Sequence, residues 1–346
     1  MDCFKLKDGD VKCTYVFNNK DCYKKCRNYL ISRGIEHDVY DVKKYYIINV
    51  FNNSLKEKIE SEERAFLEME NLSLENGYLA TKQYKDKTII SIKELEIGGN
   101  KSVVISGPCS IESEDILRKI ALDMKEIGVD ILRGGAFKPR TSPYDFQGLG
   151  RAGIDILCKI GNEMDMPVIT EIMDVRELEY MIDKVDILQV GSRNMYNYPL
   201  LKELGRIDKP VLLKRGLSAT IKEFLLSAEY IMLEGNEKVI LCERGIRTYE
   251  NYMRNTMDIA SIALLKEMTH LPIIADPSHA TGKRSLIEPL SKAAVVAGAD
   301  GILIEAHIKP DLAWSDGKQT INIPILRNII RTLYDTNEVL NNKTTR

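Results

Sequence analysis

The chain has 346 residues, of which 44% are hydrophobic and 29% charged, a composition typical of a soluble globular protein. Its 49 Lys and Arg nearly balance its 51 Asp and Glu, so the overall charge gives no reason to expect a nucleic acid or an anionic membrane as partner. The N-terminal residues lack the apolar segment of a secretory signal, and no window approaches the length of a transmembrane helix. The seven cysteines are odd in number and scattered, which fits a reducing compartment, and we expect a cytoplasmic protein.

Residues 1–70 predict a small ferredoxin-like (ACT-like) domain of α+β type. The pattern is strand, helix, two strands and a second helix, and the expected elements are 11–18, 19–33, 37–42, 44–51 and 54–63. The domain carries no catalytic constellation, so we expect a role in ligand sensing or assembly. Residues 71–87 are polar and rich in turn-forming residues, which is typical of a linker.

Two cysteines of this predicted domain, Cys22 and Cys26, stand four residues apart on the first helix. This spacing could supply half of a metal site, but no matching His or Cys pair follows nearby. A structural or incidental role is favoured, and the sequence leaves their function open.

Residues 88–340 predict a (β/α)8 barrel. A hairpin over 88–92 and 94–97 comes first, and short runs of Val, Ile and Leu then alternate with amphipathic stretches of helical length. The eight runs are 102–108, 130–135, 167–172, 186–191, 210–216, 238–245, 272–277 and 301–307. Near-continuous apolar strands indicate a parallel sheet buried on both faces, and eight such units favour a closed barrel over an open sheet. No G-x-G-x-x-G turn follows the first run, which disfavours a dinucleotide site.

Charged side chains stand at the carboxyl ends of these strands, where a barrel places its active site. The cations are Arg133, Lys138, Arg140, Arg193, Lys214, Arg215 and Arg244. In a protein without net positive charge, such a concentration predicts a cleft for phosphates or carboxylates. Strand alternation sends Lys214 and Arg215 to opposite faces, and we expect Lys214 to point into the barrel mouth.

A second group of strand-end residues combines the donors that divalent transition metals prefer. Cys109, His279 and Glu305 follow strands 1, 7 and 8, which are neighbours in a closed barrel, and Asp316 lies in the loop after strand 8. The set predicts one divalent ion, Mn, Fe, Co or Zn, whose identity the sequence leaves open.

These segments resemble the 3-deoxy-D-arabino-heptulosonate 7-phosphate (DAHP) synthases, in particular the short type I subgroup with an N-terminal ferredoxin-like regulatory domain. The matching motifs are GPCSIES (107–113), LRGGAFKPRTSPYDFQGLG (132–150), ITEIMD (169–174), ILQVGSRN (187–194), PVLLKRG (210–216), ILCERGIRTYE (240–250), ADPSHATGKR (275–284) and SDGKQ (315–319). The resemblance implies condensation of phosphoenolpyruvate, erythrose 4-phosphate and water to DAHP and phosphate, the first step of the shikimate pathway towards the aromatic amino acids.

The resemblance also implies roles for individual residues. Phosphoenolpyruvate would be bound by Arg133, Lys138, Gly191, Ser192, Arg193, Lys214 and Arg244. The phosphate of erythrose 4-phosphate would be bound by Arg140, Thr141 and Ser142. The metal ligands would be Cys109, His279, Glu305 and Asp316.

Catalytic roles are expected for Lys138, Glu171, Cys109 and His279, the last two through the metal. Lys138 is a candidate proton donor to the developing alkoxide, and we expect neighbouring cations to lower its pKa. Glu171 is a candidate for positioning or activating the water.

Three alternatives remain open at this point. A 3-deoxy-manno-octulosonate 8-phosphate synthase would use arabinose 5-phosphate in a similar barrel, but KPRTS, with Pro139 before Arg140, is more similar to the DAHP enzymes. A Schiff-base aldolase would use Lys214, although the adjacent Arg215 disfavours it. The third is a metal-free binding protein on an inactive barrel.

For the N-terminal domain, the resemblance implies feedback regulation by an aromatic amino acid, Tyr or Phe, bound between subunits of a homotetramer. The sequence identifies neither the effector nor the oligomeric state.

Overall fold

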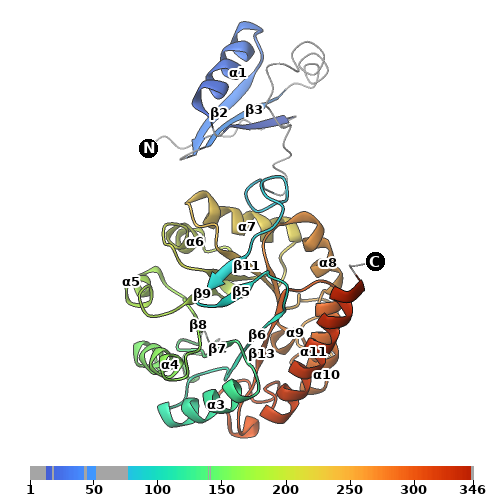
Figure 1. The fold of residues 1–346 in the computed structure, drawn as a ribbon. Coiled ribbons are helices and arrows are strands. Elements are labelled where there is room, and N and C mark those ends of the chain that lie inside the picture. The colour runs from blue at the N-terminus through green and yellow to red at the C-terminus, as the bar shows by residue number, and fades with distance from the viewer. Residues whose placement is uncertain are drawn as a thin grey trace. The chain divides into compact units, whose positions relative to one another are not determined.

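The computed structural model describes residues 13–17, 19–42, 45–51, 77–138, 140 and 142–343. The chain divides into two compact units, Met1–Tyr78 and Leu79–Arg346 (Figure 1). Within the described ranges, no helix is both long and apolar enough to span a membrane.

The first unit is a three-stranded antiparallel sheet with a helix. Its elements are β1 (Cys13–Phe17), α1 (Lys20–Ser32), β2 (His37–Val42) and β3 (Tyr45–Val50), and the strand order is β1-β3-β2. Asn19 begins α1, since its side chain accepts hydrogen bonds from the backbone amides of Asp21 and Cys22. The order agrees with the predicted pattern up to β3. The predicted helix at 54–63 lies outside the described residues.

Cys22 and Cys26 belong to the apolar contact between α1 and the sheet. Cys26 is buried in one cluster with Leu30 and Ile48, and Cys22 packs against that cluster. Among the described residues, the two cysteines thus have the surroundings of side chains that pack in a hydrophobic core.

The second unit is a closed barrel of eight parallel strands. They are β6 (Val103–Gly107), β7 (Ile131–Arg133), β8 (Val168–Glu171), β9 (Ile187–Val190), β10 (Val211–Lys214), β11 (Val239–Glu243), β12 (Ile273–Ala275) and β13 (Gly301–Glu305). Each pairs with the next, and β13 pairs with β6 to close the ring. The predicted fold class is therefore confirmed, with all eight strands inside the expected ranges.

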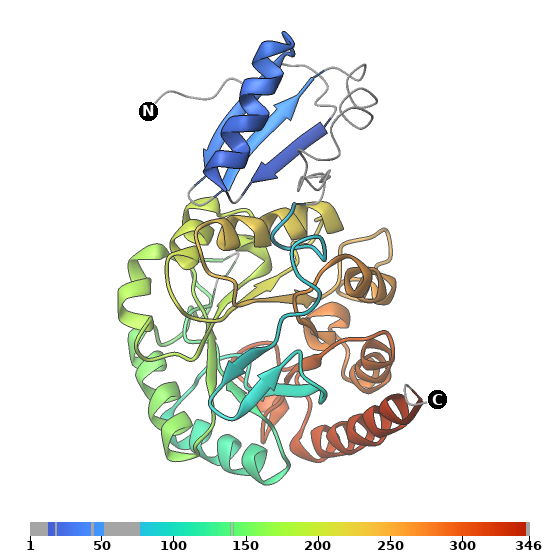
Figure 2. The ribbon, with the colours of Figure 1, turned by 45° about the horizontal axis from the view of Figure 1, so that its top comes forward.

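Helices surround these strands, as Figures 1 and 2 show. They are α3 (Glu114–Glu126), α4 (Arg151–Glu163), α5 (Leu178–Met181), α6 (Tyr198–Gly205), α7 (Ile221–Leu233), α8 (Ile259–Met268), α9 (Pro277–Thr281), α10 (Arg284–Val296) and α11 (Ile323–Lys343). Several begin at a side chain that caps free backbone amides, such as Ser113 before α3 and the Thr220–Glu223 capping box of α7. Their apolar faces cover the outside of the sheet, which explains why the strands are apolar throughout.

A short hairpin closes the amino-terminal end of the barrel. It consists of β4 (Ile90–Ile92) and β5 (Leu95–Ile97), the second of which is labelled in Figure 1. Its Ile90, Ile92 and Ile97 are buried in one cluster with residues from the barrel interior. Because this end is filled by apolar side chains, a polar site inside the barrel can open only at the carboxyl ends of the strands.

The segment before the hairpin differs from the predicted linker at 71–87. Residues 71–76 lie outside the described residues, but Leu79 and Ala80 donate backbone hydrogen bonds to the Glu229 carboxylate on α7, each at 2.9 Å. His270 also contacts the Leu79 carbonyl through Nε2, at 2.6 Å. Residues 79–87 therefore belong to the barrel unit, because they satisfy backbone groups against its helices.

Candidate active site

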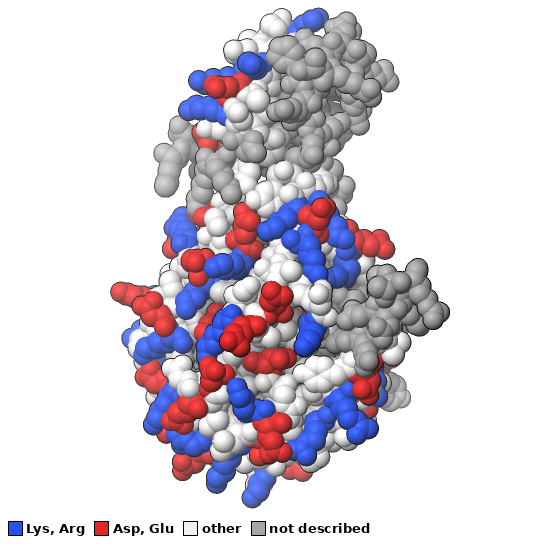
Figure 3. All heavy atoms as spheres, in the orientation of Figure 1, with Lys and Arg blue, Asp and Glu red and all other residues white. Residues whose placement is uncertain are grey.

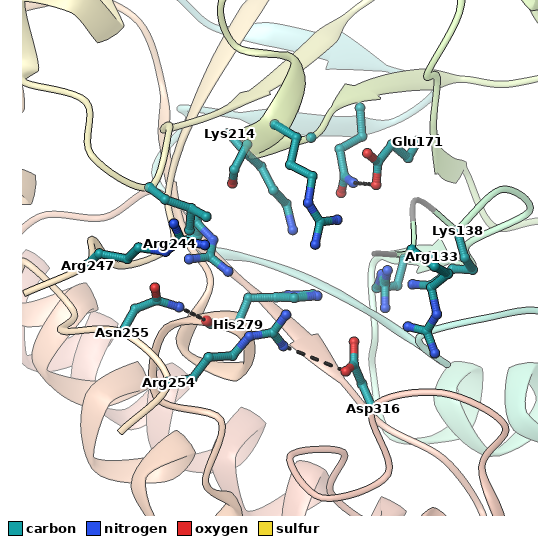
Figure 4. Close-up of a pocket in the computed structure, with 16 residues that line it drawn as sticks. Arg133, Lys138, Glu171, Lys214, Arg244, Arg247, Arg254, Asn255, His279 and Asp316 are labelled. Carbon is teal, nitrogen blue, oxygen red and sulfur yellow. Dashed lines mark hydrogen bonds and ion pairs between the residues drawn. The ribbon is translucent and has the colours of Figure 1, made fainter. Parts of the chain in front are cut away.

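A cavity opens where the barrel strands end at their carboxyl side, and cationic side chains dominate its wall (Figure 4). Its charged lining residues are Arg133, Lys138, Arg140, Arg193, Lys214, Arg244, Arg247, Arg254, Glu171 and Asp316. Gln189, Gly191, Ser192, Leu217, Asn255 and His279 complete the wall. On the face of the barrel unit seen in Figure 3, by contrast, acidic and basic side chains are interspersed. The excess of positive charge in the cavity suits ligands that carry more than one negative group.

The strands place these cations at their ends. Arg133 and Lys214 are the last residues of β7 and β10, and both line the cavity. Arg215 instead turns away, and its Nη1 donates to Glu243 at 2.8 Å. The alternation of side chains along β10 thus separates a cavity residue from a structural ion pair.

Two of the cavity cations are held by fully buried carboxylates. The Lys214 Nζ lies 2.6 Å from Asp276 Oδ2, and the Arg133 Nη1 lies 2.9 Å from Glu305 Oε1. Burial tends to raise the pKa of Asp276, but His279 and Lys214 lower it by more, and the result is well below its ordinary range. These carboxylates therefore stay ionised and keep both cations oriented.

Of the four predicted metal ligands, His279 and Asp316 line the cavity, and the buried Cys109 and Glu305 contact them. Cys109, Glu305 and Asp316 offer ligand atoms that all lie within 4.8 Å of one another. The Cys109 Sγ is 3.2 Å from Asp316 Oδ2, and the His279 Nε2 is 3.2 Å from Glu305 Oε1. The thiol after β6 and the two carboxylates therefore form one close group, and the imidazole of α9 adjoins it through Glu305. Thiol, imidazole and carboxylate are donors that fit a divalent transition metal.

Asp276 gives His279 its orientation. It begins α9 by accepting from the His279 backbone amide at 3.0 Å, and its Oδ2 contacts the His279 Nδ1 at 2.7 Å. A carboxylate on Nδ1 keeps the proton there and leaves Nε2 as the atom that faces Glu305. This arrangement is common behind histidine ligands of metals.

Lys138 contacts the same thiol. Its Nζ lies 2.8 Å from Cys109 Sγ and donates to the Cys109 carbonyl at 3.0 Å. We predicted a lowered pKa for Lys138, and this prediction is wrong in direction. Burial lowers this pKa most, but Cys109 and Glu305 raise it by more, so the pKa of Lys138 lies above its ordinary value. The effect of Cys109 and Glu305 on the pKa of Lys138 therefore exceeds that of burial and of Arg133.

Glu171, the last residue of β8, points into the cavity next to a glycine. A Cβ placed on Gly191 would lie 2.1 Å from Glu171 Oε1, so a larger residue there would displace the carboxylate from this position. Gln189 Nε2 donates to the other carboxylate oxygen at 3.4 Å. The close packing orients Glu171 towards the cavity.

The predicted sugar-phosphate residues are only partly brought to the cavity. Arg140 lines it, and its Nε lies 3.9 Å from Asp145. The Ser142 hydroxyl accepts from the Tyr144 amide at 3.3 Å and is not among the lining residues. Thr141 lies outside the described residues.

Arg247, Arg254 and Asn255 were not predicted as site residues. They come from the long loop between β11 and α8, well beyond the strand end. The expectation that active-site residues stand at the carboxyl ends of the strands does not locate residues within a long loop. The signal that could have found them is the basic composition of the loop itself.

Comparisons with known proteins identify relatives of this chain. A model of the DAHP synthetase I family matches residues 83–342. The phospho-2-dehydro-3-deoxyheptonate aldolase of Thermotoga maritima is 46% identical over 250 residues, which cover 72% of this chain and 74% of that protein. A 2-dehydro-3-deoxyphosphooctonate aldolase of Koribacter versatilis is 29% identical over 270 residues, which cover 72% of this chain and 96% of that protein.

Solved structures that are similar to this chain include enzymes of the same name. A crystal structure of the Thermotoga maritima phospho-2-dehydro-3-deoxyheptonate aldolase (DAHP synthase) has a TM-score of 0.77 and 37% identity, and the match covers 94% of this chain and 97% of that one. A truncated form of the 3-deoxy-D-arabino-heptulosonate 7-phosphate synthase of the same organism has a TM-score of 0.71 and 41% identity, with 76% and 97% covered.

The pKa of Cys109 leads to a prediction about metal affinity. Burial, foremost, and the charge of Glu305 raise this pKa to about 12, so the thiol of the metal-free protein keeps its proton at neutral pH. A divalent ion that binds the thiolate must displace this proton, so its affinity should rise about tenfold per pH unit between about pH 7 and about pH 8.5. Titration of the metal-free protein with Mn²⁺ or Zn²⁺ measures this dependence.

Cys109→Ser should bind the ion much more weakly and lose the dependence on pH. Cys158→Ser is the matched control, because Cys158 lies on α4 outside the site, and it should behave like the parent chain. A Cys109→Ser protein with unchanged affinity and pH dependence would contradict the assignment.

Proposed function

The chain belongs to the DAHP synthetase I family, and from this premise we propose that its barrel condenses phosphoenolpyruvate with erythrose 4-phosphate and water to give DAHP and phosphate. The observation that carries the proposal is a strongly cationic cavity that directly adjoins Cys109, His279, Glu305 and Asp316. Two phosphorylated substrates need a cationic cavity, and activation of an aldehyde by a metal needs the adjoining ligands.

Phosphoenolpyruvate carries a phosphate and a carboxylate, so it needs cations on two sides. We assign one end of it to Arg193, Lys214 and Arg244 and the other to Arg133 and Lys138. The backbone of Gly191 and Ser192 lies beside Arg193 and completes the first group. Cations that buried carboxylates hold in place can orient C3 of phosphoenolpyruvate without reorganising.

Erythrose 4-phosphate is assigned to the other side of Lys138, with its phosphate near Arg140, Thr141 and Ser142. Arg140 supports this assignment because it lines the cavity. The aldehyde would then lie next to Lys138 and the metal ligands.

One divalent ion would be held by Cys109, His279, Glu305 and Asp316, and when bound it would supply a Lewis acid for the sugar aldehyde. The donor set admits Mn, Fe, Co or Zn and does not select among them.

In the reaction, C3 of phosphoenolpyruvate forms a bond to the aldehyde carbon, water adds at C2, and phosphate leaves by cleavage of its C–O bond. Lys138 is the proposed proton donor to the former aldehyde oxygen. Its raised pKa keeps Nζ charged at neutral pH, and its contact with Cys109 places it beside the ligands. Glu171, oriented by Gly191 and Gln189, is proposed to position the water.

The alternatives have less support. The octulosonate relative is 29% identical, against 46% for the heptonate relative. A Schiff base would require the Lys214 amine to leave its ion pair with the buried Asp276 carboxylate, which lies 2.6 Å from Nζ.

The substrate assignment predicts a clear preference. With phosphoenolpyruvate and Mn²⁺ present, phosphate release should depend on erythrose 4-phosphate and be at least about 100-fold slower with arabinose 5-phosphate, because the sugar phosphate is held at a fixed distance from the reacting carbon. Turnover with the five-carbon sugar alone would refute the proposal.

Lys138→Met should lower kcat by about 100-fold or more, since a proton donor typically contributes that much. Mass spectrometry of the product and steady-state rates at saturating metal measure the effect. Near-normal turnover would exclude the donor role of Lys138.

Regulation is proposed for the N-terminal unit, with Tyr or Phe as effector, a homotetrameric assembly and a place in the cytoplasmic biosynthesis of aromatic amino acids. The support is that the Thermotoga structure matches 94% of this chain, the N-terminal unit included, and that a truncated form of the same enzyme has been solved.

Removal of residues 1–78 should therefore leave an active barrel that Tyr and Phe no longer inhibit. Steady-state rates of the full chain and of the truncated chain, each with Tyr, Phe or Trp, measure this. Equal inhibition of both forms would refute the regulatory role.

A further inference from the structure

Gln319 joins two of the proposed metal ligands, Glu305 and Asp316. It is only 4% exposed and lies three residues after Asp316, in the loop that follows β13. Its Nε2 donates to Glu305 Oε2 at 2.7 Å, and its backbone amide donates to the Asp316 carbonyl at 3.2 Å. Through one residue, the ligand at the end of β13 is connected to the ligand of the following loop.

The chemistry of the neighbours determines which way the Gln319 amide points. Arg254 Nη1 donates to Gln319 Oε1 at 3.0 Å, and a guanidinium can only donate. The ionised Glu305 carboxylate can only accept, so the NH₂ group must face it. The amide therefore has one favourable orientation, with both of its ends in use.

Arg254 is itself anchored next to the third ligand. Its backbone amide donates to the Thr281 carbonyl at 2.9 Å, and Asn255 Nδ2 donates to the His279 carbonyl at 3.0 Å. The Arg254 guanidinium also lies 3.7 Å from Asp316 Oδ1 (Figure 4). Residues 254–255 thus contact α9 through their hydrogen bonds, and the Arg254 side chain extends to the loop that carries Asp316.

We propose that Gln319, oriented by Arg254, is a positioning residue that holds Glu305 and Asp316 in the arrangement a divalent ion requires. The inference deepens the proposed function, because it concerns the metal site assigned there.

Glu305 shows why the amide matters. This carboxylate is fully buried, and its Oε1 is already contacted by Arg133 and His279. Gln319 supplies the hydrogen bond to Oε2, so removal of the amide leaves a buried charged oxygen without this partner. Asp316 has a φ of 50°, which is unfavourable for a residue other than glycine, and the hydrogen bond from the Gln319 backbone helps to hold that turn.

The same contacts predict that Arg254 acts on the ligands more than on the substrates. Its guanidinium is directed to Gln319 and Asp316, whereas Arg193, Lys214 and Arg244 are the cations assigned to phosphoenolpyruvate. Loss of Arg254 should therefore raise the Kd for the metal ion.

The test uses Gln319→Met, which keeps the length of the side chain and removes the amide, and Arg254→Gln. Each metal-free protein is titrated with Mn²⁺, and the fluorescence of Trp314, the single tryptophan of the chain, reports binding two residues from Asp316. We expect the Kd for Mn²⁺ to rise about 10- to 100-fold in both variants. For Gln319→Met, whose side chain is not part of the cavity wall, kcat should recover at saturating Mn²⁺ and both KM values should stay within about twofold of the parent.

Arg327→Gln is the matched control, because Arg327 forms an exposed ion pair on α11, and its Kd should equal that of the parent. Thermal unfolding verifies that each variant is folded. Should Gln319→Met fail to fold, Arg254→Gln decides alone, since this side chain is exposed to the cavity and its loss leaves the core intact.

An unchanged Kd for Mn²⁺ in Arg254→Gln would overturn the inference. A raised KM for either substrate in Gln319→Met at saturating metal would also overturn it, because the Gln319 amide would then act on the substrates and not only on the ligands. A parent chain that binds Mn²⁺ but forms no heptulosonate product would instead refute the proposed function and leave this test valid.

Discussion

The pairing of β13 with β6 is the constraint on which the rest of the site depends. It runs from Gly301 beside Val103 to Glu305 beside Gly107, and it closes the eight-stranded ring. Cys109 follows β6 and Glu305 ends β13, so this one register brings a thiol and a carboxylate together from distant parts of the sequence. Asp316 and His279 then approach from the adjoining loop and helix, and a metal site becomes possible only once the ring is closed.

Charge in the cavity is organised around buried carboxylates. Glu305 contacts Arg133, and Asp276 contacts both Lys214 and His279. Burying such groups costs several kcal/mol per ion unless partners and hydrogen bonds compensate, so the pairs are arranged for orientation more than for stability. The consequence is a set of cations that are already in place when an anionic substrate arrives.

The sequence predicted most of the barrel and most of the residues around its mouth. Strand ends such as Arg133, Glu171 and Lys214 could be located because a parallel barrel collects all carboxyl ends at one face. The loop residues Arg247 and Arg254 could not, because a long loop has no periodicity from which its path can be read. The direction of the pKa shift of Lys138 was mispredicted for a related reason, since it depends on which charged groups lie near Nζ in space.

Local pattern alone therefore determined the eight strands, the apolar core and the identity of the polar residues at the strand ends, because each of these follows from spacing along the chain. Only the tertiary structure decided which polar groups meet. The contacts of Gln319 with Glu305, of Asp276 with Lys214 and of Glu171 with Gly191 all join different elements. Distances and charges between such elements are set by barrel closure and side-chain packing, and no stretch of sequence carries them by itself.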